Sequence, residues 1–126
     1  MIQSLGGISV LIVENEMIVG MMLCDEIARA GGTSIGPVTS VAGALKEVES
    51  QIVHAVILDA KLVDGSGEDL AVCLEERRIP YVVVSGYEKA NLPRRLRGAP
   101  FVAEPISLPL LMEAIGGLNG AEALSC

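Results

Sequence analysis

Five short runs of β-branched and small apolar residues constrain the fold of this chain more than any other feature. Three of the runs are apolar at consecutive positions, which is typical of strands covered on both faces, as in a parallel sheet. We predict strands over residues 8–13, 33–38, 55–59, 81–85 and 100–103. The intervals between them are long enough to hold the helices that parallel strands need as crossover connections.

Apolar residues recur every three or four positions in the first two intervals, which predicts two amphipathic helices. The first helix presents Val19, Leu23, Ile27 and Ala30. We expect Gly31-Gly32 to end it. The second helix presents Val41, Leu45, Val48 and Ile52. Thr39 or Ser40 is the expected N-cap of this second helix.

The remaining intervals predict three further helices. Ser66 and Asp69 resemble a capping box that opens a helix in which Leu70 and Leu74 face inward. The fourth interval contains Pro93 and has room for only a short helix. The last helix is capped by Ser107 and presents Leu108, Leu111, Met112, Ile115 and Leu118.

The order of elements is therefore (βα)₅, which predicts an α/β fold with an open, doubly wound parallel sheet and helices on both faces. With 126 residues, of which 51% are hydrophobic, we expect a single domain. Its core would span about residues 8–118, followed by a short flexible C-terminal tail.

Composition argues against several classes of partner. The formal net charge is −7 and there is no Trp, so neither phosphate attraction nor base stacking favours nucleic-acid binding. Arg94, Arg95 and Arg97 form either a solvated helix face or a docking patch for an acidic partner. The sequence contains no signal peptide and no membrane-length apolar run, and its three scattered cysteines favour reduced thiols and a cytoplasmic location.

Polar residues follow the predicted strands where each strand ends. These residues are Glu14, Asn15, Glu16, Asp59, Ser85 and Glu104. The carboxyl ends of parallel strands meet at one edge of the sheet, where ligands of such folds bind. Clustered oxygen ligands suit Mg²⁺. A carboxylate beside that ion can attack phosphorus and form an aspartyl phosphate. Two structural alternatives stay open: Asp59 could form only a turn or cap a helix, and Ser85-Gly86 could be only a turn.

Several segments together resemble the receiver domains of bacterial two-component response regulators, over about residues 8–118. The segments are VLIVENE, AVILDAKLVDGSG, VVVSGY and the strand that contains Phe101. The resemblance implies a flavodoxin-like sheet with strand order 2-1-3-4-5. It also implies that Glu14 and Asn15 occupy the acidic pair, which binds Mg²⁺ together with Asp59, and that Asp59 accepts the phosphoryl group.

The same resemblance assigns further positions. Gly67 falls at the loop glycine, Ser85 at the switch hydroxyl and Phe101 at the fifth-strand aromatic residue. The segment VVVSGYEKANLPRRLRGAP is also similar to a subgroup of single-domain alphaproteobacterial receivers, whose fourth strand reads Phe-Ala-Thr-Gly, a hydrophobic residue and Tyr.

Two positions depart from the family pattern, and a third could compensate for one of the departures. Glu104 stands where the family has a lysine that pairs with the phosphoryl oxygens, and Asn15 stands where it has an aspartate. Lys61 occupies the position whose main-chain carbonyl is a metal ligand in the family. Its ammonium either pairs with a carboxylate of the site, replacing the missing lysine, or is exposed on the loop.

Two functions follow from these residues. In the first, the chain is a stand-alone receiver that takes a phosphoryl group on Asp59 from a sensor histidine kinase or phosphotransfer protein and signals to an output protein by contact. In the second, it is a degenerate receiver that binds partners without phosphorylation. Neither is an enzyme, and the sequence leaves a homodimer open. A haloacid dehalogenase-type hydrolase fits less well, since Lys61 stands in place of its second aspartate, and a dinucleotide-binding domain lacks its GxGxxG.

Overall fold

The computed structural model describes residues 7–62, 65–85, 96, 100–103, 109 and 113–115. The elements are β1 (Ser9–Val13), α1 (Met17–Arg29), β2 (Thr33–Val38), α2 (Val41–Ser50), β3 (Ala55–Asp59), β4 (Lys61–Leu62), β5 (Gly65–Ser66), α3 (Glu68–Glu76), β6 (Tyr81–Ser85) and β7 (Phe101–Ala103). The helix expected in the fourth interval, most of the last helix and the C-terminal tail lie outside the described residues.

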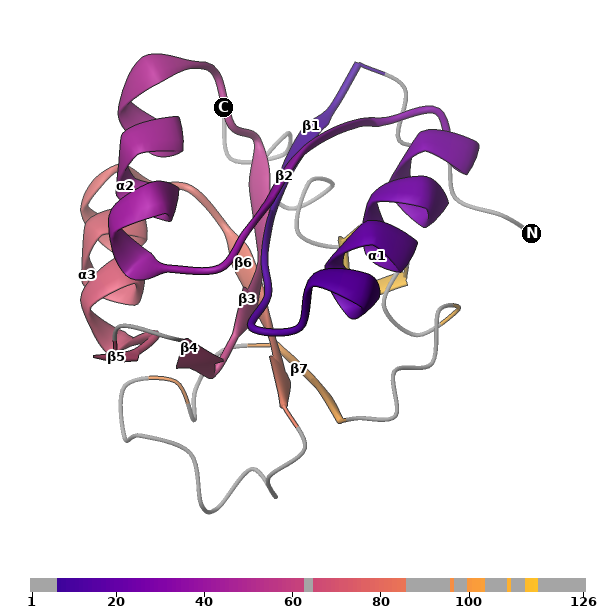
Figure 1. The fold of residues 1–126 in the computed structure, drawn as a ribbon. Coiled ribbons are helices and arrows are strands. Elements are labelled where there is room, and N and C mark those ends of the chain that lie inside the picture. The colour runs from indigo at the N-terminus through magenta and orange to yellow at the C-terminus, as the bar shows by residue number, and fades with distance from the viewer. Residues whose placement is uncertain are drawn as a thin grey trace.

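The five long strands form one parallel sheet in the order β2-β1-β3-β6-β7. This order confirms the predicted flavodoxin-like arrangement. Helix α1 covers one face of the sheet, whereas α2 and α3 cover the other (Figure 1). The carboxyl ends of β1, β3 and β6 all point toward the lower side of the view in Figure 1, so residues that follow these strands meet at a common edge.

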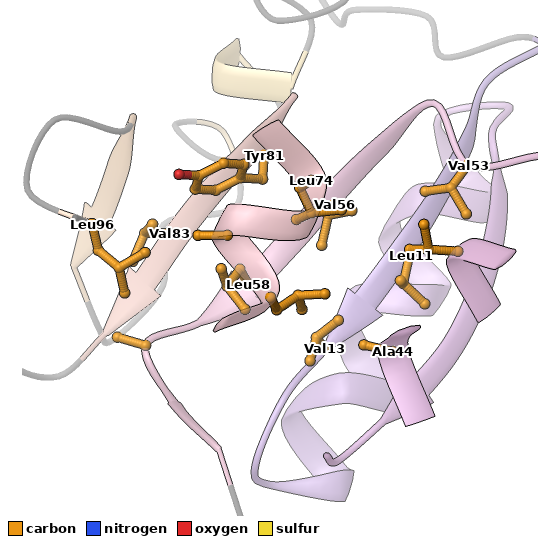
Figure 2. Packing of buried hydrophobic residues seen from close by; sticks show 14 of the residues in the cluster. Leu11, Val13, Ala44, Val53, Val56, Leu58, Leu74, Tyr81, Val83 and Leu96 are labelled. Carbon is orange, nitrogen blue, oxygen red and sulfur yellow. The ribbon is translucent and has the colours of Figure 1, made fainter. Parts of the chain in front are cut away.

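Alternate residues of the sheet build two separate hydrophobic cores. On the side of α2 and α3 the strands contribute Leu11, Val13, Val56, Leu58, Tyr81 and Val83 (Figure 2). On the side of α1 they contribute Val10, Ile12, Ile57, Val82, Val84 and Val102. Because both faces are covered, β3 and β6 are buried at every position, which explains why their sequences are apolar without alternation.

The first two helices begin and end largely as their sequences predict. Helix α1 stops just before Gly31, whose φ of +92° suits glycine. Helix α2 is capped by Ser40, whose Oγ accepts a hydrogen bond from the Gly43 N–H at 3.0 Å. The prediction for Ile52 is wrong. It is 73% exposed, because α2 ends at Ser50 and the chain has already become extended.

The predicted capping box of the third helix is also wrong. Ser66 pairs with Lys61 in the short antiparallel ladder of β4 and β5, which the sequence did not indicate. The helix therefore begins at Glu68 with Gly67 as its N-cap, and no side chain caps it. Glu68 and Asp69 lie in its first turn instead, where their charges favour the helix N-terminus.

Strand β2 contains an irregularity that positions the end of β1. Gly36 has φ +99°, and a Cβ at this position would lie 2.9 Å from the Ile12 carbonyl oxygen. The pairing of β1 with β2 shifts register at this point, so Val13 lies opposite Val38. The Val38 carbonyl then accepts the Glu14 N–H at 2.9 Å, which fixes the main chain where the strand becomes the turn.

Candidate functional site

Three polar or charged side chains are buried among the described residues, and all three lie at the carboxyl ends of strands. Glu14 is 1% exposed and follows β1, Asp59 is 7% exposed and ends β3, and Ser85 is 2% exposed and ends β6. Burying a carboxylate is costly unless the protein compensates its charge. Two buried carboxylates at one edge of a sheet therefore mark that edge as a candidate functional site.

The strand register brings these three residues to the same level. Val13 pairs with Leu58 across β1 and β3, so Glu14 and Asp59 are the next residues along the two strands. Asp59 in turn lies opposite Val84, the residue before Ser85. The Ala60 N–H donates to the Val84 carbonyl at 3.1 Å and keeps β3 and β6 paired beyond Asp59.

Two successive N–H groups of the turn between β1 and α1 each bind one of the carboxylates. The Asn15 N–H donates to Asp59 Oδ2 at 3.0 Å, and the Glu16 N–H donates to Glu14 Oε2 at 3.0 Å. Both groups lie just before the N-terminus of α1, where the helix dipole adds partial positive charge. Asn15 itself is exposed, and its described contribution to the site is its main chain.

The loop after Asp59 folds back toward the strand that precedes it. The Gly67 N–H donates to the Ala60 carbonyl at 3.2 Å. A Cβ at Gly67 would lie 3.1 Å from Leu58 Cδ1 and 3.3 Å from the Asp59 carbonyl oxygen. The absence of a side chain therefore allows the start of α3 to lie close behind Asp59.

The other candidate residues lie away from this edge of the sheet or outside the described part of the chain. Phe101 begins β7 opposite Val83 and is half-buried against the core on the side of α2 and α3, below the level of Ser85. Glu104 and the side chain of Lys61 lie outside the described part of the chain, as do Arg94, Arg95 and Arg97.

The donor set of the edge fits Mg²⁺. This ion is usually held by one or two carboxylates and keeps several of its waters. Glu14 follows β1, Asp59 ends the adjacent β3, and the exposed Asn15 directly follows Glu14. Within the described ranges no group of three or more His, Cys, Asp or Glu side chains has the arrangement of a metal site.

Of the two cysteines in the described part of the chain, Cys24 lies on α1 and has a shifted pKa. Burial and, to a smaller extent, the charge of Asp25 raise the pKa of this thiol, whereas a hydrogen bond with Ser34 lowers it, and the net direction is upward. A raised pKa keeps the thiol protonated near neutral pH, so Cys24 is a poor nucleophile.

An apolar surface that was not predicted from the sequence lies beside the site. Met17, Ile18, Met21 and Met22 of α1 are between 49% and 75% exposed, and we call these four residues the α1 surface. The signal was present, because α1 is apolar on its outer side as well as along the stripe that faces the sheet. No helix in the described part of the chain is long and apolar enough to cross a membrane.

Comparison with known proteins supports the similarity already expected from the sequence. No family model matches the chain, and no curated protein does. The solution structure of SdrG from Sphingomonas melonis Fr1 is 34% identical, with 88% of this chain and 95% of SdrG covered and a TM-score of 0.76. The same values hold for the BeF3-activated conformation of SdrG from Pseudomonas melonis Fr1.

A CheY-like response regulator receiver domain from Methylobacillus flagellatus has the same fold, with a TM-score of 0.76. The two sequences are 24% identical, and the match covers 88% of this chain and 98% of the Methylobacillus domain. The similarity to SdrG extends over nearly the whole of both chains. The chain therefore belongs to the response regulator receiver domains.

Proposed function

We propose that this receiver domain accepts a phosphoryl group on Asp59 from a sensor histidine kinase or a phosphotransfer protein. The observation that carries the proposal is the concentration of the buried polar side chains, among the described residues, at the carboxyl ends of β1, β3 and β6. Such burial costs stability, and a phosphoryl-transfer site is a functional reason to retain it. The domain acts as a signalling module rather than as an enzyme, and passes its signal to an output protein by contact.

The proposed chemistry is a displacement at phosphorus. An oxygen of the Asp59 carboxylate donates an electron pair to phosphorus, the bond from phosphorus to the donor's leaving atom breaks, and that bonding pair departs with the donor. The product is an acyl phosphate on Asp59. Ser85 ends the neighbouring strand, and we assign its hydroxyl the role of hydrogen-bonding to the new phosphoryl oxygens.

We further propose that Mg²⁺ binds at this edge. The carboxylates of Glu14 and Asp59 would hold it, with the amide oxygen of Asn15 and the main-chain carbonyl of Lys61 as further ligands. When bound, the ion neutralises negative charge on the phosphoryl oxygens. An amide at position 15 supplies one negative charge fewer than an acid would, so we expect weak Mg²⁺ affinity.

The α1 surface is the proposed contact for the phosphoryl donor. It begins two residues after Asn15, whose N–H binds Asp59, so a protein that reaches Asp59 also covers the start of α1. Glu16 and Asp25 are exposed at either end of the surface. An apolar surface with acidic residues at its borders favours a donor that presents apolar side chains flanked by Lys or Arg.

The test is phosphorylation by acetyl phosphate in the presence of Mg²⁺, followed by intact-mass analysis. We expect the mass of one phosphoryl group to be added to the wild-type chain and none to Asp59→Asn. Asp25→Asn, which removes an exposed carboxylate of α1, is the matched control and should be modified like the wild type.

An inert wild-type chain, even at high Mg²⁺, would contradict the proposal and indicate a degenerate receiver that acts by binding alone. Glu104→Lys would then show whether the missing cation is the cause. If like-charge repulsion at position 104 blocks the reaction, this substitution restores Asp59-dependent modification.

A further inference from the structure

We propose that the main-chain N–H of Asn15, rather than its side chain, positions the Asp59 carboxylate for phosphoryl transfer. The inference rests on the proposed function and adds an orienting group to it. The N–H of Asn15 lies 3.0 Å from Asp59 Oδ2, although the two residues are 44 positions apart in the sequence. Asn15 is thus a positioning residue, and any amino acid except proline can supply the same group at this position.

The hydrogen bond fixes the orientation of the carboxylate because the N–H is itself held on a constrained turn. On one side of the turn the Glu14 N–H binds the Val38 carbonyl at 2.9 Å, and on the other the Gly20 N–H binds the Glu16 carbonyl at 2.9 Å inside α1. A donor anchored between a strand and a helix has little freedom to follow a rotating side chain. Asp59 therefore loses rotational freedom before a phosphoryl donor arrives, which is the entropic contribution of preorganisation to a transfer reaction.

The same bond distinguishes the two oxygens of Asp59. An N–H donor withdraws electron density from Oδ2 and places that oxygen toward the β1–α1 turn. We assign nucleophilic attack to Oδ1, which forms the bond to phosphorus while Oδ2 becomes the carbonyl oxygen of the acyl phosphate and keeps its hydrogen bond. With acetyl phosphate as donor, the bond from phosphorus to the acetyl oxygen breaks and acetate leaves with the electron pair.

An amide in place of an acid at position 15 should therefore have little effect on how Asp59 is oriented. A departure from the family's acidic residue alters the side chain but leaves the N–H in place. The next N–H along the turn binds Glu14 in the same way at 3.0 Å, so each buried carboxylate has a main-chain donor at the positive end of α1. The loss of a side-chain charge at residue 15 therefore affects cation binding more than it affects the orientation of Asp59.

Proline substitution tests the assignment, because it removes one N–H. We expect Asn15→Pro to lower the rate constant for phosphorylation, at saturating acetyl phosphate and Mg²⁺, by about 10- to 100-fold, as is typical for loss of one hydrogen bond to a charged group. Asn15→Ala keeps the N–H, so its rate constant at saturating Mg²⁺ should exceed that of Asn15→Pro by about tenfold or more, although it loses an amide ligand and requires more Mg²⁺ to saturate.

Glu16→Pro is the matched control, since it places proline in the same turn but removes the N–H that binds Glu14. At saturating Mg²⁺, a rate constant for Glu16→Pro well above that of Asn15→Pro supports the proposal. Equal losses in both proline variants would overturn it, because the conformation of the turn would then matter and not the particular N–H. A wild-type rate constant for Asn15→Pro would overturn it as well.

A second measurement needs neither a proline variant nor phosphorylation. In amide NMR spectra of the full chain, Asp59→Ala should move the Asn15 amide proton strongly upfield, because its charged acceptor is gone. The Glu16 amide proton, bound to Glu14, should move much less. An unmoved Asn15 amide proton would contradict the proposed contact, whereas failure of the wild-type chain to accept a phosphoryl group would contradict only the function on which the proposal rests.

Discussion

The two ends of the parallel sheet use polar side chains in different ways. At the amino end, the Tyr81 hydroxyl donates to Glu75 on α3 at 2.7 Å, which ties a strand to the helix beside it. At the carboxyl end, Glu14 and Asp59 are buried together with Ser85, and main-chain N–H groups bind the two carboxylates. The amino-end contact contributes to stability, whereas the carboxyl end bears a cost in stability. Destabilising buried polar groups are typically kept in a protein when its function requires them.

The largest effect on stability should come from the apolar residue next to Asp59. Leu58 is fully buried in the core on the side of α2 and α3, so Leu58→Ala should lower the free energy of unfolding by about 2–5 kcal/mol. Urea denaturation followed by circular dichroism measures this change. Molecules that remain folded should still accept a phosphoryl group. Loss of phosphorylation in fully folded Leu58→Ala would show that the core residue Leu58 is also required by the site, contrary to the proposed separation of core and site.

A smaller effect is expected where the core and the site meet at Gly67. The new Cβ of Gly67→Ala would contact Leu58 and the Asp59 carbonyl at 3.1–3.3 Å, so we expect a loss of about 1–2 kcal/mol in the free energy of unfolding. Phosphorylation should slow as well, because the main chain of Asp59 must shift. Gly43→Ala, in the first turn of α2, is the control and should leave the phosphorylation rate unchanged.

Unlike the two substitutions above, a substitution of Asp59 itself should increase the free energy of unfolding. Without Mg²⁺, Asp59→Asn removes one of two neighbouring buried negative charges, and we expect the free energy of unfolding to rise by on the order of 1 kcal/mol. Thermal unfolding in a chelating buffer would measure the rise. A marked loss of stability would mean that Asp59 serves the fold, contrary to this account.

Tyr81→Phe probes the amino end and should have the smallest effect. It removes the hydrogen bond to Glu75 without altering the packing of the ring, which should cost about 0.5–1.5 kcal/mol of unfolding free energy. The extent and rate of phosphorylation should match those of the wild type at a temperature at which both are folded. A slower reaction would show that the two ends of the sheet are coupled.

Much of this structure follows from sequence because it depends on local patterns. The apolar runs predict the five strands, and the resemblance to receiver domains implies their order in the sheet. Of the two expected caps, Thr39 and Ser40, the structure has Ser40 at the start of α2. The errors arise where tertiary pairing overrides a local signal. Ser66 has the spacing of a cap, but its pairing with Lys61 moves the start of α3 to Glu68.

The sequence also placed the candidate site residues at strand ends, but it could not show how they are held. The bond from the Asn15 N–H to Asp59 depends on the register of β1 against β3 and on the path of the following turn. Residue identity carries no information about a main-chain donor. The prediction that Asn15 acts through its side chain therefore does not include its main-chain hydrogen bond to Asp59.

The most direct test of the central claim is an amide NMR titration of the wild-type chain with Mg²⁺ and beryllofluoride, the mimic present in the activated conformation of SdrG. We predict saturable shifts at Asn15, Asp59 and Ser85 that require both additives and are absent from Asp59→Asn. No change in the wild-type spectrum at high Mg²⁺, or the same change in Asp59→Asn, would contradict the claim that the carboxyl end of the sheet is a phosphoryl-accepting site.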